Sequence, residues 1–161
     1  MVWLPSELLA DGSVIRYQTR RIALSPDGFP DTERVPTHLA DHIEDFTNAI
    51  LLDPEYYEAY YGRADAYHRL REYQKAVDDL TKAIELKPED ADAYRKRADT
   101  YNRLGLKAKA LDDYTQAIDL DPEDAEAYSN RGWTYDTLGK RQTALEDYDK
   151  AIELDPKEVK A

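Results

Sequence analysis

The segment EAYYGRADAYHRL (58–70) recurs as DAYRKRADTYNRL (92–104) and EAYSNRGWTYDTL (126–138), each copy 34 residues after the last. The segments that follow recur at the same spacing, as AVDDLTKAIELKP from Ala76, ALDDYTQAIDLDP from Ala110 and ALEDYDKAIELDP from Ala144. The period is also marked by Pro54, Pro88, Pro122 and Pro156. Repetition at a fixed period of this length predicts small structural units that bury their apolar faces against one another.

The composition of the 161-residue chain excludes several classes of partner and site. It has 34 acidic and 22 basic side chains, a formal net charge of −12, and no cysteine. This charge repels the phosphates of nucleic acids and anionic lipid surfaces, so neither is expected as a partner. Disulfides and thiolate metal sites are excluded. Because the start lacks the features of a signal peptide and no stretch is long enough for a membrane span, we expect a soluble cytoplasmic protein.

Apolar and small residues within each unit follow the spacing of α-helices. Tyr60, Ala64 and Tyr67 share one stripe of a first helix. Ala76 and Leu80 share one stripe of a second helix. Because Ala64 and Ala76 are small, the two helices can approach closely while tyrosines fill the flanking gaps. The same pattern in the later copies predicts antiparallel helix pairs throughout.

The residues between these segments predict where helices end and begin. Gly105 and Gly139 fall just past the first helix of their units, where a left-handed residue ends a helix at little steric cost. Arg71 takes this place in the first unit, so we expect a strained or differently shaped turn there. Asp53 and Asp121, each followed by Pro and Glu, are predicted to cap the helices after them.

These features resemble the tetratricopeptide repeat family, whose 34-residue helix-turn-helix units stack into a right-handed superhelix. The family signature is matched here by Tyr60, Ala64, Tyr67, Ala76, Leu80, Ala83 and Pro88, and by their counterparts in both later copies. The resemblance implies an all-α, helix-turn-helix repeat solenoid with full repeats at 57–90, 91–124 and 125–158. It also implies a surface that binds proteins or peptides, not a reaction.

Both ends of the repeat array depart from the family pattern. Residues 37–56 align with the second helix of a partial repeat, and the prolines in residues 1–36 forbid a regular first helix there. This irregular N-terminal segment is expected to form either a cap or an extended strand. No capping helix follows the third repeat. The sequence leaves open a truncated chain or burial of Tyr148 and Ile152 against another chain.

One stripe of each first helix faces away from its hairpin partner, and in the resembled family this stripe lines a concave groove. Here the stripe holds Tyr61, Asp65, His68, Arg95, Asp99, Asn102, Ser129, Trp133 and Asp136, and Glu126 extends it at the start of its helix. Asp65 and Asp99 are expected to point away from the core. We expect the acid-leaning, partly aromatic groove to bind a basic or amphipathic protein or peptide, the alternative being an ordinary solvated face.

Other charged residues favour structural roles. Arginine recurs beside the core stripe and aspartate in the second helices, at Arg63, Arg97, Arg131, Asp79, Asp113 and Asp147. An anion-binding ladder is one interpretation, but the equal number of carboxylates at a constant separation favours interhelical ion pairs. His38 and His42 have a metal-compatible spacing without an apparent third ligand, so no metal or other cofactor is expected.

Neither the binding of chaperone tails nor enzymatic activity is expected of this chain. The family's clamp for chaperone C-terminal tails needs lysine, asparagine, asparagine, lysine and arginine at positions that correspond to Tyr61, Asp65, Lys96, Glu126 and Asn130. Only Lys96 could serve, and the two acids would repel the tail carboxylates. The chain also has no Gly-rich phosphate loop and no nucleophile motif, so it is not expected to be an enzyme.

The sequence therefore predicts a protein-interaction module that binds a peptide or protein partner in the groove. The alternative is a structural self-assembly unit that forms a homo-oligomer through its uncapped repeat ends, including the C-terminal repeat face. Tyr61 and Trp133 favour the first interpretation. The missing terminal cap favours the second.

Overall fold

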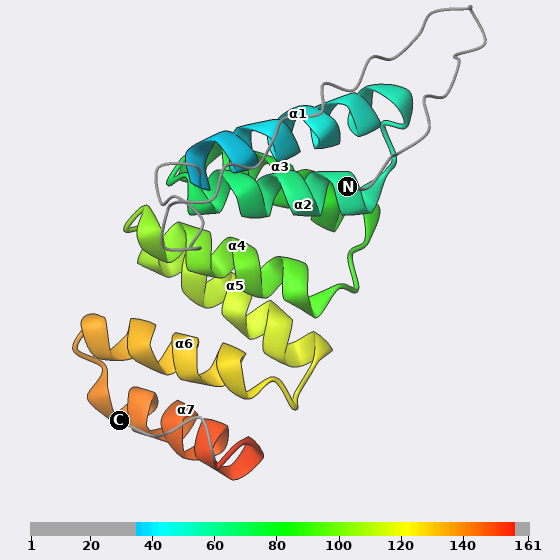
Figure 1. Cartoon of the computed structure of the whole chain (residues 1–161). Coiled ribbons are helices and arrows are strands. Elements are labelled where there is room, and N and C mark those ends of the chain that lie inside the picture. The colour runs from blue at the N-terminus through cyan, green and yellow to red at the C-terminus, as the bar shows by residue number, and fades with distance from the viewer. Residues whose placement is uncertain (1–34, 157–161) are drawn as a thin grey trace, which may run out of the picture. The chain divides into compact units, whose positions relative to one another are not determined.

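The computed structural model describes residues 35–156, which are helical with no strand in that range (Figure 1). The helices are α1 (Val35–Leu52), α2 (Tyr57–Arg69), α3 (Tyr73–Leu86), α4 (Ala91–Arg103), α5 (Lys107–Leu120), α6 (Ala125–Thr137) and α7 (Arg141–Leu154). The predicted all-α repeat solenoid is confirmed. The predictions for the N-terminal segment and for the residues after Pro156 fall outside the described residues, and the repeat boundaries stay a prediction.

Six of these helices form three helical hairpins that stack in chain order (Figure 1). Each first helix packs along the second helix of its own hairpin, as α2 does on α3, and each hairpin then contacts the next through α3 and α4 or through α5 and α6. α4 also touches α6 directly. The first helices of successive repeats therefore lie close enough to build one surface together.

The core of each hairpin contains the small residues that the sequence pattern predicts. Ala64 and Ala76 are fully buried together with Leu80. In the next repeat, Ala98 and Ala110 pack in the same way, but Tyr114 takes the place of Leu80. A fully buried side chain of this size contributes about 1.5–3 kcal/mol of hydrophobic stabilisation. The substitution of tyrosine for leucine also brings a hydroxyl group into the core.

The predicted arginine–aspartate pairs form, and each one also includes a threonine. The guanidinium of Arg97 donates to both carboxylate oxygens of Asp113, at 2.7 and 2.8 Å, and to Thr81 Oγ1 on α3 at 3.2 Å. The threonine hydroxyl donates to the carbonyl of Val77, so its oxygen is free to accept from the arginine. The other two sets are Arg63 with Asp79 and Thr47, and Arg131 with Asp147 and Thr115. Each arginine therefore links three consecutive helices, which supports the structural interpretation over an anion-binding ladder.

The turns inside the hairpins confirm the expected backbone conformations. Gly105 and Gly139 both have φ of 76°, and Arg71 at the equivalent place has φ of 62°. A side chain in this left-handed region costs about 1–2 kcal/mol relative to a helical conformation. The first hairpin therefore contains a strained turn that the other two avoid.

Replacing Arg71 by glycine is expected to raise the free energy of unfolding by about 0.5 kcal/mol. Glycine removes the backbone strain of about 1–2 kcal/mol. It also makes the unfolded chain more flexible, which lowers the gain in stability by roughly 0.4–1 kcal/mol. Urea denaturation would measure the change. The matched control is Gly105→Ala, which should destabilise the protein by about 1 kcal/mol. A less stable Arg71→Gly variant would show that the arginine side chain contributes more than its backbone costs.

The predicted helix caps at Asp53 and Asp121 are wrong. α6 begins at Ala125, four residues after Asp121, and its cap is Asp124, whose Oδ1 accepts from the amide of Ala127 at 3.0 Å. Asp121 instead accepts from the amide of Glu123 at 3.1 Å, which closes the turn between the repeats. Short acidic side chains suit both turns and caps, so two of them three residues apart are ambiguous in sequence.

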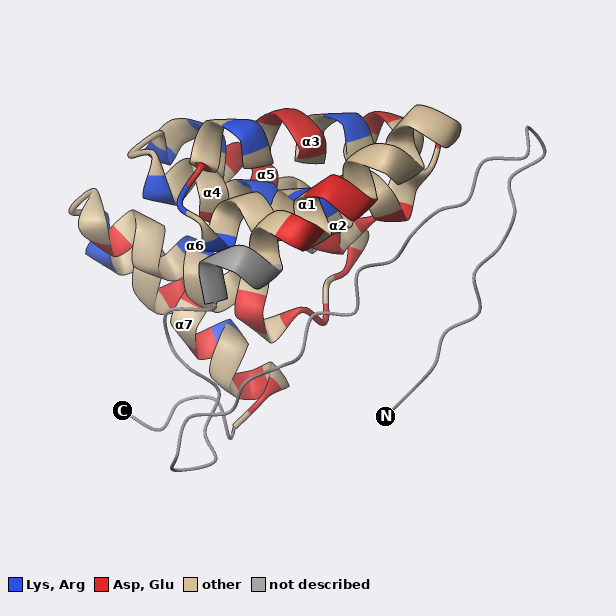
Figure 2. Ribbon diagram, turned by 45° about the horizontal axis from the view of Figure 1, so that its top comes forward, with Lys and Arg blue, Asp and Glu red and all other residues tan. Residues whose placement is uncertain are grey.

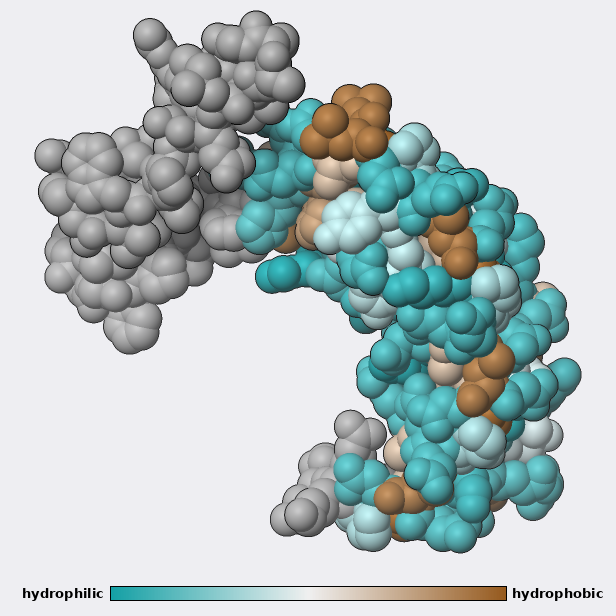
Figure 3. Space-filling view, turned by 90° about the vertical axis from the view of Figure 1, so that its right-hand side faces the viewer, coloured by the Kyte–Doolittle hydropathy of each residue, from teal (hydrophilic) through white to brown (hydrophobic). Residues whose placement is uncertain are grey.

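The surface of the described residues is mostly hydrophilic. In the space-filling view the stacked helices curve around a hollow, and hydrophobic residues appear as separate patches (Figure 3). The loops that join successive repeats are acidic (Figure 2). Within residues 35–156, none of the helices combines the length and apolar character needed to cross a membrane.

Candidate peptide-binding groove

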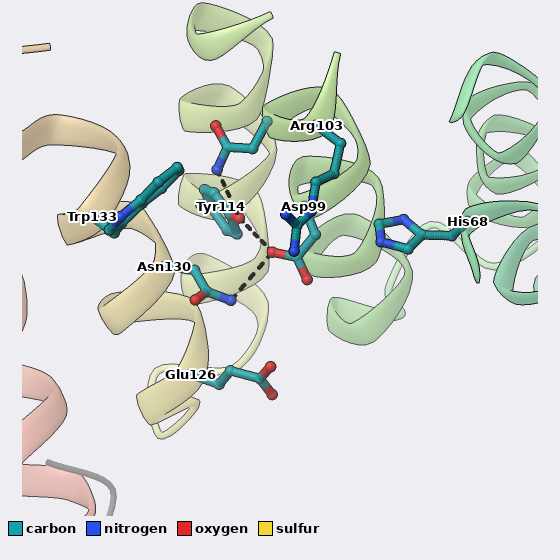
Figure 4. A pocket seen from close by; sticks show the side chains of 8 residues that line it. His68, Asp99, Arg103, Tyr114, Glu126, Asn130 and Trp133 are labelled. Atoms are coloured by element: carbon teal, nitrogen blue, oxygen red, sulfur yellow. Dashed lines mark hydrogen bonds between the residues drawn. The ribbon is translucent and has the colours of Figure 1, made fainter. Parts of the chain in front are cut away.

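A pocket of about 640 Å³ lies between the first helices of the repeats (Figure 4). Its lining comes from α2, α4, α5 and α6, and consists of His68, Asp99, Asn102, Arg103, Tyr114, Glu126, Asn130 and Trp133. Five of these were predicted groove residues: His68, Asp99, Asn102, Glu126 and Trp133. The repeat stacking thus gathers side chains that lie more than one repeat apart in the chain.

The other predicted groove residues lie outside this pocket, and most of them are engaged with neighbours. Asp65 forms an ion pair with Lys96, whose ammonium also lies 5.4 Å from the ring centroid of Tyr61. Asp136 is exposed and lies 3.8 Å from Arg141. Ser129 is partly buried on α6. These residues flank the pocket and do not line it.

Arg95, also predicted for the groove, is held in an acidic cluster outside the pocket. Its guanidinium contacts Asp92 at 2.6 Å and Asp124 at 2.8 Å, and it pairs with Glu126. Glu126 also lines the pocket, and its negative charge is partly balanced because it pairs with Arg95. Arg95 therefore acts as a link between α4 and the start of α6 and is poorly placed to meet a ligand.

Asp99 does not face away from its hairpin partner, contrary to the expectation. Its Oδ1 accepts a hydrogen bond from the hydroxyl of Tyr114 on α5, and another from the Asn130 side-chain amide at 3.2 Å. Burial raises the pKa of the Asp99 carboxyl, although the Tyr114 hydrogen bond and the nearby Arg95 oppose that shift. Within the described residues no cation comes within ion-pairing distance of Asp99. It is therefore a half-buried carboxylate without a counterion.

A chain of hydrogen bonds fixes the orientation of Asn102 beside Asp99. The side-chain amide of Asn102 donates to Tyr114 Oη at 3.1 Å and to Thr134 Oγ1 at 2.7 Å. Both hydroxyls already donate elsewhere, Tyr114 to Asp99 and Thr134 to the carbonyl of Asn130, so the Asn102 nitrogen must face them. The Asn102 oxygen is then an acceptor, buried and without a hydrogen-bond partner in residues 35–156.

His68 makes the equivalent contact one repeat earlier. Its Nδ1 lies 3.0 Å from Thr100 Oγ1, and that hydroxyl donates to the carbonyl of Lys96. The network therefore places the imidazole hydrogen on Nδ1 and leaves Nε2 as an acceptor. Burial lowers the pKa of His68, as do the charges of Lys96 and Arg103, against the opposing carboxylates. The ring is neutral at pH 7.

Replacing His68 by asparagine, the residue at this place in the next repeat, is expected to make the protein less sensitive to acid. Because the folded-state pKa of His68 lies below its unfolded value, the unfolded state binds the proton more readily. The stability present above pH ~6.5 is thus partly lost as the pH falls. Asparagine keeps an N–H donor for Thr100 but does not titrate.

Urea denaturation at about pH 7.5 and pH 5.5 would test this expectation, since the range spans the ordinary histidine pKa. The difference between the two pH values should be smaller for His68→Asn than for the unmodified protein. His42→Asn is the matched control, because His42 is exposed on α1. An unchanged pH dependence in His68→Asn would contradict the assignment of a buried, neutral imidazole.

Trp133 forms the aromatic wall of the pocket and is half exposed. The Lys107 ammonium lies 4.3 Å from the centroid of its ring, and burial lowers the pKa of Lys107. A cation at this distance is attracted by the electron-rich ring face. The Trp133 side chain is therefore half exposed, with Lys107 beside its ring, and its role as an aromatic platform for a ligand stays a prediction.

Sequence reasoning did not place three of the lining residues in the groove, namely Arg103, Tyr114 and Asn130, whereas Glu126 is expected there because it extends the groove stripe at the start of its helix. Tyr114 was assigned to the core, which is correct for its ring, but its hydroxyl reaches the pocket. The signal that could have found it is the change from Leu80 to tyrosine at one repeat position. Among the described residues, no cluster of three or more histidine, aspartate or glutamate side chains is arranged to hold a metal ion.

Comparison with known proteins agrees with this architecture. The family model for the tetratricopeptide repeat matches residues 57–90 and 125–158, and a second model, for the TPR repeat, matches residues 108–139. No curated protein sequence matches the chain significantly. Many solved structures resemble it.

Three of the similar structures share between 29% and 34% of their residues with this chain. The crystal structure of MamA is 34% identical and has a TM-score of 0.72, with 76% of this chain and 72% of that chain covered. The first TPR of Spaghetti (RPAP3), bound to the HSP90 peptide SRMEEVD, is 30% identical with a TM-score of 0.61. The match covers 63% of this chain and 80% of that chain. The TPR domain of Arabidopsis OM64 is 29% identical with a TM-score of 0.61, and the match covers 62% of this chain and 83% of that chain. The chain belongs to the tetratricopeptide repeat family.

Proposed function

We propose that this chain is a protein-interaction module that binds a basic or amphipathic peptide segment in the groove between its first helices. The observation that carries the proposal is the pocket in which the carboxylate of Asp99, without a counterion, lies near the exposed ring of Trp133. An anionic group and an aromatic face together favour a ligand with a cationic and an apolar part.

A similar structure supports peptide binding in general but not the same ligand. The Spaghetti domain is described with the peptide SRMEEVD, which ends in two glutamates, a valine and an aspartate. In this chain, Lys96 is held by Asp65, and Glu126 adds an acid to the pocket. An acidic peptide tail would meet repulsion here, so the proposed ligand has the opposite charge.

The proposal predicts that Trp133→Ala weakens peptide binding by at least about tenfold, the usual effect of losing a central aromatic anchor. Random peptides displayed on phage would be selected on the unmodified protein, and synthetic copies of the selected peptides titrated against both proteins. We expect the selected peptides to be enriched in lysine or arginine and to bind more weakly as salt is raised.

The matched control is Leu51→Ala, since Leu51 is an exposed apolar residue on α1, outside the pocket. Trp133 is half exposed, so its replacement should leave the thermal unfolding nearly unchanged. Selected peptides that bind Trp133→Ala as tightly as the unmodified protein, or that show no enrichment in basic residues, would refute the proposed groove.

Self-assembly is a second candidate function, favoured by the exposed side chains of Leu145 and Ile152 on the last described helix. Apolar residues on one helix can be buried by a second copy of the chain. Light scattering across a wide concentration range would decide the matter. A molar mass that stays at the monomer value would exclude it.

A further inference from the structure

The pocket described above offers hydrogen-bond acceptors that no residue in the described range uses. The Asp99 carboxylate receives both of its hydrogen bonds on Oδ1, so Oδ2 has no donor. His68 presents Nε2 as an acceptor because its Nδ1 hydrogen is directed to Thr100. The Asn102 oxygen also has no hydrogen-bond partner among residues 35–156, but it is buried beneath the pocket surface. Figure 4 shows the His68 ring directed towards Asp99.

The positions of these acceptors are set by the protein and do not depend on a ligand. Asp99 is held by α5 and α6, through Tyr114 and Asn130. Asn102 is held by the same two helices, through Tyr114 and Thr134. Preorganised polar groups lose little conformational freedom when a ligand arrives, so they favour tight and selective binding.

We propose that this pocket is the anchoring site for an arginine side chain of the bound peptide. The proposal rests on the peptide-binding function above and specifies its ligand. A guanidinium presents five N–H donors in a planar fork and no acceptor, which complements a wall of acceptors around one carboxylate. A lysine ammonium has three donors and matches such a spread of acceptors less well.

Four cations near the pocket bear on this assignment. Lys107 already lies 4.3 Å from the ring centroid of Trp133, Lys96 pairs with Asp65, and the other two are arginines. Arg103 lines the pocket and its charge acts on His68, but its side chain is exposed and forms no ion pair with Asp99. Arg95 already contacts three carboxylates. Removing the charge of Arg103 should therefore strengthen the binding of a cation and weaken the binding of an anion, which gives the test two opposite outcomes.

The probe is Nα-acetyl-arginine amide, compared with Nα-acetyl-citrulline amide, which has nearly the same shape but no charge. Each would be titrated into the full ¹⁵N-labelled chain while the side-chain amide signals of Asn102 and Asn130 and the indole signal of Trp133 are followed. We expect saturable shifts with the arginine compound at a Kd on the order of 1 mM, a reasonable value for a ligand of this size. The citrulline compound should bind at least about tenfold more weakly.

Two variants and one control complete the experiment. Asp99→Asn removes the charge but keeps an oxygen for the Tyr114 hydroxyl. This variant should bind the arginine compound about tenfold more weakly. Arg103→Gln should bind the arginine compound about twofold to threefold more tightly, because a like charge near the surface is removed. Asp112→Asn, at an exposed site on α5 outside the pocket, should change nothing.

The inference is overturned if citrulline binds as well as arginine, if Asp99→Asn binds as the unmodified protein does, or if no saturable shift occurs. Tighter binding of Nα-acetylglycine, a carboxylate probe, that is lost in Arg103→Gln would show that the pocket takes an anion instead. The proposed function is judged separately, because peptides selected on the unmodified protein can still require Trp133 when no free arginine compound binds.

Discussion

Replacing Arg97 by methionine is expected to lower the free energy of unfolding by about 3 kcal/mol. The substitution leaves the buried Asp113 carboxylate without its two donated hydrogen bonds, and Thr81 without its contact to α4. Removing one partner of a buried ion pair typically costs about 3–5 kcal/mol. The side chains of Arg97 and Asp113 keep 15% and 10% exposure, which places the estimate at the lower end.

Urea denaturation would measure the loss, with two comparisons. Lys82→Met breaks the exposed pair between Lys82 and Glu85 and should change stability by no more than about 0.5 kcal/mol. The double substitution Arg97→Met and Asp113→Leu removes both charges and should recover much of the lost stability. A single Arg97→Met variant that loses no more than Lys82→Met would show that the buried arginine does not hold the hairpins together.

The repeat architecture could be predicted from sequence because its determinants are local and recur. The 34-residue period, the small residues at Ala64 and Ala76, and the glycines at the turns each act within one hairpin or between adjacent hairpins. The arginine–aspartate pairs were predictable for the same reason, since their separation is constant. Threonine was missed as the third partner because it belongs to the preceding repeat, so its contact crosses a repeat boundary.

The environment of the groove acids could not be predicted from the period, because equivalent positions meet different neighbours. Asp65 lies in the repeat whose second helix has Leu80, which cannot donate a hydrogen bond, and it pairs with Lys96. Asp99 lies opposite Tyr114, whose hydroxyl donates a hydrogen bond to it and holds it half-buried at the pocket wall. A pattern that treats the two aspartates as the same residue hides this difference, and the pocket depends on it.

Replacing Tyr114 by phenylalanine is expected to lower the free energy of unfolding by about 2 kcal/mol while leaving the ring packing intact. The lost hydroxyl is the donor to Asp99 and the acceptor for Asn102, so two polar groups lose a partner at once. Leaving a buried polar group unsatisfied costs about 1–3 kcal/mol. Tyr148→Phe is the matched control, because Tyr148 holds the same position in the next repeat and makes no side-chain hydrogen bond with residues 35–156.

The loss in Tyr114→Phe should also depend on pH, and in a direction that identifies its cause. Burial already raises the pKa of Asp99, and the Tyr114 hydroxyl acts against that rise. Without the hydroxyl the charged carboxylate is less stable in the folded protein, so the difference from the unmodified protein should be largest at neutral pH. It should shrink as the pH falls through the folded-state pKa of Asp99, because the protonated carboxyl needs no donor. Urea denaturation of both proteins from pH 7.5 downwards would measure it, and an equal loss at every pH, or one matched by Tyr148→Phe, would show that the hydroxyl does not support the Asp99 carboxylate.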